Sequence, residues 1–286
     1  MMNSTCQILT ERQQREREYY DSYCTLHDET PVNFAPIEGV EKRPWNSYWY
    51  SYEEVVAHFH AVKSQEDRTP RLLDFGCGTG QSAISTAKLG YRVSGFDISE
   101  RQIESARGRA KEFGVQEICD FSVQVAENLE YADNSFDCIL GIDILHHLEI
   151  EPSIHESYRV LRPGGVAIFR EWIEVDAFDR VRETALVRRF FPKGKSIEKH
   201  RTEDERKLNR EDMRLIRQVF PLVKLRQFGV LSRLCRILPE RTWLAASLQR
   251  MDHAIFRVAP VVSSLGGEVV LVLRKPADFK PPSAPR

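Results

Sequence analysis

The sequence lacks any run of about 18 apolar residues, the length that an α-helix needs to cross a bilayer. Its amino end also lacks the apolar stretch of a secretory signal peptide. An excess of one charge is missing as well, because the formal net charge is -1 at pH 7. A basic surface of the kind that binds nucleic acid is therefore not expected. We predict a cytoplasmic protein without a nucleic-acid partner.

Paired cysteines are also missing, although the chain contains six cysteines. They lie far apart, without the spacing of a zinc ribbon or of a redox dithiol. No other cluster of metal-binding side chains with ligand spacing is evident in the sequence. We therefore predict reduced thiols and no metal site.

Short β-rich runs alternate with helical patterns from residue 71 to residue 172. Strands are expected at 71–75, 92–96, 120–125, 136–144 and 166–172, and helices at 81–88, 100–113 and 153–161. Two further strands are expected at 222–228 and 268–274. Such alternation is typical of parallel strands with helices on both faces. The prediction is an α/β fold with a doubly wound, mostly parallel seven-stranded sheet.

Five segments are expected along the chain. They are an N-terminal helical segment (1–65), the core (66–175), a basic helical cap (176–220), the last two strands with an amphipathic helical insertion (221–276) and a Pro-rich tail (277–286). Within the cap, Thr202 and Glu205 have the spacing of a capping box, and Asn209 with Asp212 begins another helix.

A glycine loop, Asp-Phe-Gly-Cys-Gly-Thr-Gly at 74–80, follows the first strand and opens a helix. Small residues there let the backbone approach a ligand, and the helix N-terminus favours an anion. Asp97 ends the second strand about twenty residues later, where a carboxylate can accept hydrogen bonds from both ribose hydroxyls. Ser99 is the better cap for the next helix, which leaves Asp97 available for adenosine.

The glycines of this loop alternate strictly, whereas dinucleotide loops separate the last two glycines by two residues. This spacing disfavours a nicotinamide dehydrogenase. Further motifs lie at 72–80, 95–99, 126–129, 133–137, 145–148 and 161–165. With these motifs in order, the segment from Leu72 to Gly165 resembles the class I S-adenosylmethionine-dependent methyltransferases, in particular the branch of quinone-ring and small-molecule methyltransferases.

The resemblance implies S-adenosylmethionine as the cofactor and assigns roles to several residues. The loop residues Asp74, Gly76, Cys77, Gly78 and Gly80 would hold the methionine part, Asp97 the ribose and Ile98 the adenine face. The chain departs from the branch at Val125, where an Asp usually accepts a bond from the adenine amino group. We expect the Ala126 backbone to read the adenine edge, while Glu127 or Asn128 reaches the amino group.

Substrate-side residues are expected at the carboxyl ends of the fourth and fifth strands, where ligands bind in such sheets. His146 or His147 can act as a base, and Asp143 and Glu171 can orient or deprotonate a polar group. Local packing of the histidines is the simpler interpretation, and Glu171 can equally pair with an Arg. Six aromatic residues that precede the sheet either close over a sulfonium or pack as a helix pair: Tyr19, Tyr20, Trp45, Tyr48, Trp49 and Tyr50.

Residues 230–250 carry Leu and Ile near helical spacing, interleaved with Arg. The pattern fits a core helix, a dimer contact or a helix on a membrane surface. The predicted function is methyl transfer to O, N or C of a small, apolar or lipid-linked acceptor. A quinone-ring C-methyltransferase is the alternative, and a protein that binds S-adenosylmethionine without catalysis is the alternative of another class.

Overall fold

The computed structural model describes residues 9–27, 37, 39–175, 206–232, 242–276 and 278. Seven strands form one sheet in the order β3-β2-β1-β4-β5-β7-β6. Their bounds are β1 Arg71–Phe75, β2 Arg92–Asp97, β3 Cys119–Val123, β4 Phe136–Ile142, β5 Leu161–Trp172, β6 Leu222–Phe228 and β7 Glu268–Arg274. The first five strands are parallel, and β7 is antiparallel to both β5 and β6. The predicted doubly wound, mostly parallel seven-stranded sheet is confirmed.

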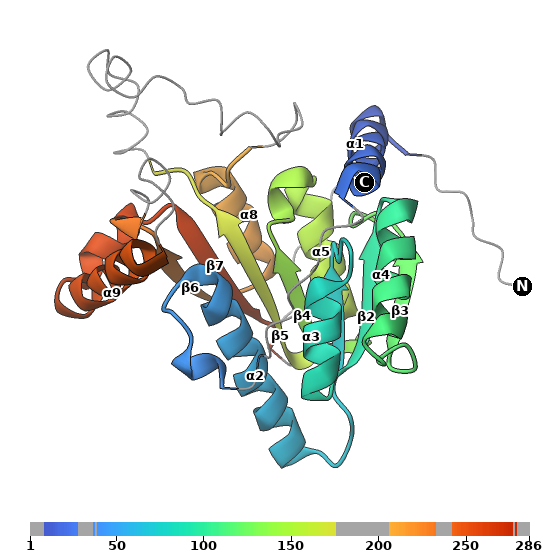
Figure 1. Cartoon of the computed structure of the whole chain (residues 1–286), viewed down its shortest axis with the longest axis horizontal. Helices are drawn as coiled ribbons and strands as arrows, with labels where there is room; N and C mark the ends of the chain where they lie inside the picture. Colours follow the sequence, from blue (N-terminus) through green and yellow to red (C-terminus); the bar gives the residue numbers. More distant parts are fainter. Residues whose placement is uncertain are drawn as a thin grey trace, which may run out of the picture.

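Helices cover both faces of the sheet (Figure 1). One face carries α2 Ser47–Gln65, α3 Gln81–Leu89 and α4 Glu100–Glu112, and the other carries α5 Ile150–Val160 and α8 Arg210–Val219. Successive β1 residues, Leu72 and Leu73, enter separate hydrophobic cores on the two faces. Because both faces are buried, these strands are apolar along nearly their whole length.

Two helices lie outside this double layer. Helix α1 (Glu11–His27) lies across the carboxyl ends of the parallel strands, beside α4, and α9 (Thr242–Val258) lies at the opposite side of the sheet (Figure 1). Helices α1 and α2 both fall within residues 1–65, and α2 packs against the sheet. Within the described residues, no helix is long and apolar enough to cross a membrane.

Several predicted boundaries are wrong: β3 ends at Val123 instead of residue 125, and α5 starts at Ile150 instead of residue 153. Two others have a clear physical reason. Strand β4 ends at Ile142 instead of residue 144, because Asp143 adopts a left-handed backbone conformation (φ 53°) that turns the chain. Strand β5 starts at Leu161 instead of residue 166, since Leu161 already pairs with Phe136. The Pro-Gly-Gly turn is therefore part of the sheet margin, where the Gly164 amide donates to the Lys275 carbonyl (2.7 Å).

The carboxyl-terminal part is described in sections. The predicted capping box of Thr202 and Glu205 falls outside the described residues, as does most of the expected basic cap. The helix start at Asn209 is confirmed: the Asn209 side chain accepts from the Asp212 amide (3.0 Å), and the Asp212 carboxylate accepts from the Asn209 amide (2.8 Å). Of the amphipathic stretch from 230 to 258, the described part forms helix α9.

Candidate active site

The loop between β1 and α3 bends because its three glycines take left-handed conformations. The φ angles are 70° at Gly76, 50° at Gly78 and 82° at Gly80, which L side chains rarely adopt. A Cβ atom on Gly76 would also lie 2.5 Å from the side chain of Ile144. The strict alternation of glycines thus follows from backbone geometry, and it leaves the loop open toward the sheet edge.

Asp97 stands at the end of β2, and its carboxylate organises the site. It accepts one hydrogen bond from the Gly78 amide and one from the Ser99 amide, each at 3.0 Å. Ser99 caps α4 by accepting from the Gln102 amide (3.1 Å), as expected. Burial raises the pKa of Asp97 to about 6, although these amide bonds act in the opposite direction.

Asp74, at the end of β1, lies beneath the glycine loop and is almost fully buried. Burial raises its pKa to about 7, against a hydrogen bond from the Ala83 backbone, and the nearby Asp97 adds to the rise. Two carboxylates are therefore desolvated close to each other at the centre of the site. Such perturbed acids cluster at functional sites.

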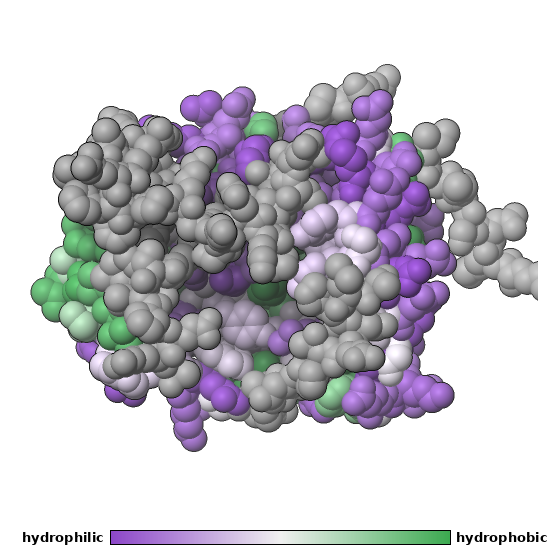
Figure 2. All heavy atoms as spheres, turned by 45° about the horizontal axis from the view of Figure 1, so that its top comes forward, coloured by the Kyte–Doolittle hydropathy of each residue, from purple (hydrophilic) through white to green (hydrophobic). Residues whose placement is uncertain are grey.

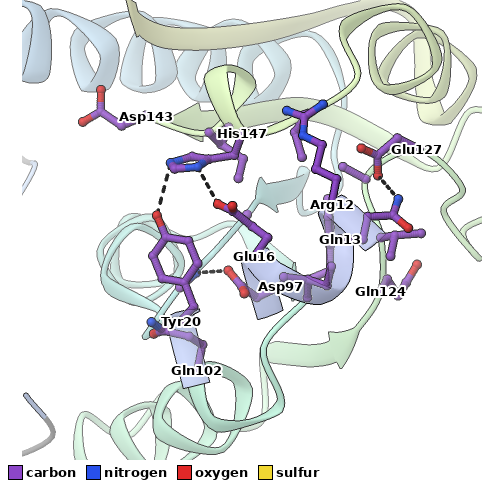
Figure 3. Close-up of a pocket in the computed structure, with 18 of the residues that line it drawn as sticks. Arg12, Gln13, Glu16, Tyr20, Asp97, Gln102, Gln124, Glu127, Asp143 and His147 are labelled. Carbon is purple, nitrogen blue, oxygen red and sulfur yellow. Dashed lines mark hydrogen bonds and ion pairs between the residues drawn. The ribbon is translucent and has the colours of Figure 1, made fainter. Parts of the chain in front are cut away.

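A cavity of about 220 Å³ opens between the glycine loop, the ends of β2 and β4, and α1 (Figure 3). Eight residues predicted for the site line this cavity: Gly76, Gly78, Asp97, Ile98, Ala126, Glu127, Asp143 and His147. Five others are placed around it without lining it: Asp74, Cys77, Gly80, His146 and Glu171. Cys77 is buried, and burial raises the pKa of its thiol, which keeps the sulfur protonated.

Helix α1 contributes lining residues that sequence reasoning missed, namely Arg12, Gln13 and Glu16. Tyr20, expected only as one of several aromatics near the sheet, also lines the cavity. Figure 3 shows Glu16 and Tyr20 pointing toward His147, on the turn after β4. His147 Nδ1 lies 2.5 Å from Glu16 Oε1, and His147 Nε2 lies 3.1 Å from the Tyr20 hydroxyl. Both ring nitrogens of His147 thus have partners from α1.

Two further contacts bind α1 over the cavity. Gln13 Nε2 donates to Glu127 Oε2 (3.0 Å), and Ser99 Oγ donates to Asp21 Oδ1 (2.6 Å). Helix α1 therefore touches the turns after β2, β3 and β4 at the same time. The only sequence signal was the i, i+4 spacing of Glu16 and Tyr20 within a charged run.

Glu127 and Gln124 both face the cavity near the position of Val125. The Glu127 carboxylate also accepts from the Glu149 amide (3.2 Å). Gln124 was not anticipated; its side chain bonds Ser122 Oγ (2.7 Å) and the Glu130 amide (2.8 Å). Asn128, the other residue expected to reach the adenine amino group, does not line the cavity.

Glu171, expected as a residue that orients the substrate, does not line the cavity and instead binds the turn after β4. It is buried, and its Oε1 accepts from the amides of Ile144 (2.7 Å) and Leu145 (2.5 Å). Its Oε2 lies 2.7 Å from His146 Nδ1. Glu171 and His146 therefore hold the turn that presents Asp143 and His147.

Asp143 pairs with Arg170 on the neighbouring strand. Arg170 Nε in turn donates to Ser47 Oγ (2.9 Å), and Ser47 Oγ donates to Glu268 Oε2 (2.5 Å). Among the described residues, Asp143 Oδ1 is buried and has no hydrogen-bond partner. Burial raises the pKa of Asp143 against the attraction of Arg170. One carboxylate oxygen of Asp143 is therefore buried without a hydrogen bond from the described residues.

In the described part of the chain, no three His, Cys, Asp or Glu residues are grouped so that they could hold a metal ion.

The sheet order, the glycine loop after β1 and the acid after β2 define the class I methyltransferase fold. Residues 73–169 match the family model of a methyltransferase domain. The core of this chain is a class I S-adenosylmethionine-dependent methyltransferase domain, as the motifs predicted.

Relatives resemble this core and little more. The chain is 39% identical over 123 residues to 27-O-demethylrifamycin SV methyltransferase of Amycolatopsis mediterranei, a match that covers 40% of this chain and 45% of that protein. It is 32% identical over 124 residues to sterol 24-C-methyltransferase of Saccharomyces cerevisiae, covering 43% and 32%. The chain thus spans less than half the length of these curated relatives.

Among solved structures, the (4+2)-cyclase SpnF shares the fold with a TM-score of 0.56 and 23% identity, covering 93% of this chain and 97% of that chain. The fold therefore extends well beyond the matched core. Because a cyclase shares it, the fold by itself does not identify a reaction.

Proposed function

We propose that this protein transfers a methyl group from S-adenosylmethionine to O, N or C of a small, apolar or lipid-linked acceptor. The observation that carries the proposal is the cavity at the carboxyl ends of β1, β2 and β4, where the glycine loop faces the Asp97 carboxylate. The named acceptors of relatives, a rifamycin and a sterol, support an apolar acceptor.

The residues around the cavity fit the cofactor in parts. Gly76 and Gly78 expose backbone to a ligand, and Asp97 has a carboxylate that can accept from ribose hydroxyls. Ile98 and Ala126 provide apolar contact for the adenine, with Glu127 at its edge. Asp74 lies below the loop and accepts a hydrogen bond from the Ala83 backbone, so that it supports the loop from beneath.

Methyl transfer from a sulfonium is a displacement for which the cofactor supplies the reactive group, so the protein supplies alignment and exclusion of water. Helix α1 closes the cavity from one side. Asp143 is a candidate base, because it lines the cavity and only its Oδ2 pairs with Arg170. His147 is bound at both nitrogens, so we assign it a positioning role in holding α1.

Two other functions compete with this proposal. A quinone-ring C-methyltransferase uses the same cofactor and differs only in its acceptor. A protein that binds S-adenosylmethionine without methyl transfer is the alternative of another class. It is supported by the cyclase, which has the same fold but is named for a different reaction.

Calorimetric titration with S-adenosylmethionine, S-adenosylhomocysteine and NAD tests the cofactor first. Binding of the first two but not of NAD is expected. Labelled methyl transfer to sterol, quinone and macrolide-type acceptors then tests the reaction. Cofactor binding with no transfer to any acceptor would favour the non-catalytic alternative, and binding of NAD alone would overturn the cofactor assignment.

We also propose, independently of the methyl transfer, a cytoplasmic location with peripheral contact to a membrane surface. It is supported by the amphipathic pattern of residues 230–250, part of which forms α9. Fractionation of cells that express the full chain, with a salt wash of the membrane pellet, would test it.

A further inference from the structure

Helix α9 presents an exposed apolar face. Trp243 is 62% exposed, Met251 52% and Val258 88%, and Val261 in the following 3-10 helix η4 (Pro260–Leu265) is 79% exposed. At 100° per residue, Trp243, Met251 and Val258 fall within a quarter-turn of each other. Figure 2 shows hydrophobic atoms gathered at the left side of the molecule, the side on which α9 lies in Figure 1. We call this face, made of Trp243, Met251, Val258 and Val261, the apolar stripe.

The opposite face of α9 is fixed to the body of the protein. Asp252 is buried, and its carboxylate accepts from the backbone amides of Leu231 (2.8 Å) and Ser232 (3.1 Å). The rings of Phe256 and Trp45 have centroids 5.4 Å apart. The inner face of α9 therefore has partners in the body of the protein, whereas the apolar stripe is exposed.

The charges on this surface have one sign. From Thr242 to Leu265 the only acidic residue is Asp252, which points inward, whereas Arg250 and Arg257 are exposed beside the apolar stripe. A two-fold dimer through this face would bring identical cationic patches together. An anionic lipid surface instead complements both the arginines and the apolar side chains, with Trp243 suited to the interface.

The inner face of α9 contacts the margin of the sheet near the carboxyl end of β5. Phe228, at the end of β6, pairs with Glu268, which also pairs with Trp172 at the end of β5. Trp45 contacts Phe228 and α9, with ring centroids 4.7 Å apart in the Trp45–Phe228 pair. Helix α9 thus lies beside the sheet margin formed by the end of β6 and the start of β7.

We propose that α9 and η4 dock the protein on an anionic membrane surface through the apolar stripe and its arginines. Docking through this face would hold the protein at a bilayer that carries a lipid-linked acceptor. This last step rests on the proposed function, whereas the docking itself does not. Vesicle binding and methyl transfer are therefore measured separately.

The test uses the full chain in flotation assays with phosphatidylcholine vesicles, with and without phosphatidylglycerol. Three variants are compared with the wild type: the double variant Trp243→Ser/Val258→Ser, the double variant Arg250→Gln/Arg257→Gln and the control Ile118→Ser. Ile118 is 39% exposed but lies at the other side of the sheet, before β3. Thermal unfolding and calorimetric titration with S-adenosylhomocysteine establish that each variant is folded.

The wild type is expected to bind anionic vesicles more tightly than neutral ones, and added salt is expected to weaken that binding. The affinity of the arginine variant for anionic vesicles should fall about fivefold for each Arg that is replaced. The affinity of the apolar variant for vesicles should fall at least about tenfold, while Ile118→Ser should bind vesicles like the wild type.

The proposal is overturned if the wild type binds no vesicles, or if the apolar variant binds as well as the wild type. A concentration-dependent dimer that Trp243→Ser/Val258→Ser abolishes, without any vesicle binding, would also overturn it by assigning the face to a second copy. Failure of methyl transfer with intact vesicle binding would count against the proposed function alone.

Discussion

Replacing Asp97 with Asn should weaken cofactor binding and remove its pH dependence. The wild-type carboxylate can accept from ribose hydroxyls while it holds the amides of Gly78 and Ser99. Asn has one acceptor oxygen and no charge. Loss of a hydrogen bond to a charged acceptor costs about 1.5–3 kcal/mol, which corresponds to about 10- to 150-fold weaker binding at pH 8.

The pH dependence follows from burial, which raises the pKa of Asp97 to about 6 in the free protein. As pH falls below 6, the carboxyl protonates and one acceptor for the ribose is lost. Wild-type affinity for S-adenosylhomocysteine should therefore fall by up to about tenfold per pH unit below 6. The Asn variant should show a flat profile, except for the contribution of Asp74.

The stability of the free protein should decrease as pH rises, whereas the affinity for the cofactor increases. A carboxyl whose pKa is raised from 3.8 to about 6 opposes folding by about 3 kcal/mol at pH 8. This cost is absent below the ordinary pKa and grows as pH rises through the folded-state value. Asn avoids the cost but leaves one of the two amides unbonded, so the free variant should unfold at a temperature no lower than the wild type.

The assay is calorimetric titration with S-adenosylhomocysteine from pH 5 to pH 8, with unfolding curves at both ends. Asp120→Asn is the control, because Asp120 is exposed on β3 and outside the cavity. Equal affinity of Asp97→Asn and the wild type at pH 8, or an unchanged pH profile in the variant, would refute the assignment of the ribose to Asp97.

Three further outcomes are expected. Glu171→Ala should lower the free energy of unfolding by about 2–4 kcal/mol, because two buried amides and His146 lose their acceptor; urea unfolding measures this, and Glu171→Gln should lose less. Tyr20→Phe should speed cofactor dissociation about fivefold in stopped-flow experiments by removing one contact with His147, and an unchanged rate would contradict the role of α1. Lys275→Met should cost about 2–4 kcal/mol in thermal unfolding, because the Lys275 ammonium donates to three oxygens; a stability equal to the wild type would exclude that role.

The sheet and the glycine loop were predictable because their signals are local. Strand and helix patterns alternate within short windows of sequence. The left-handed backbone conformations at Gly76 and Gly78 favour glycine, so the loop can be recognised from its glycines. The acid after β2 follows at a fixed distance. Boundaries failed where one residue changed direction, as at Asp143, whose positive φ leaves no trace in apolar spacing.

The cover of the cavity was not predictable in the same way. Glu16 and Tyr20 meet a histidine that lies about 130 residues later in the chain, and a charged run with little apolar periodicity is typical of a solvated helix. Glu171 was placed correctly at a strand end. Its actual partners, the amides of Ile144 and Leu145, became visible only once β4 and β5 were paired.

The attachment of α1 to the turns after β2, β3 and β4 has a consequence for turnover. Contacts of Glu16, Tyr20, Gln13 and Asp21 must all separate before the cavity opens on that side. A spent cofactor would then leave no faster than the helix lifts, whatever the speed of the chemical step. Under the proposed function, spent cofactor that accumulates would therefore occupy the closed cavity and slow the next turnover.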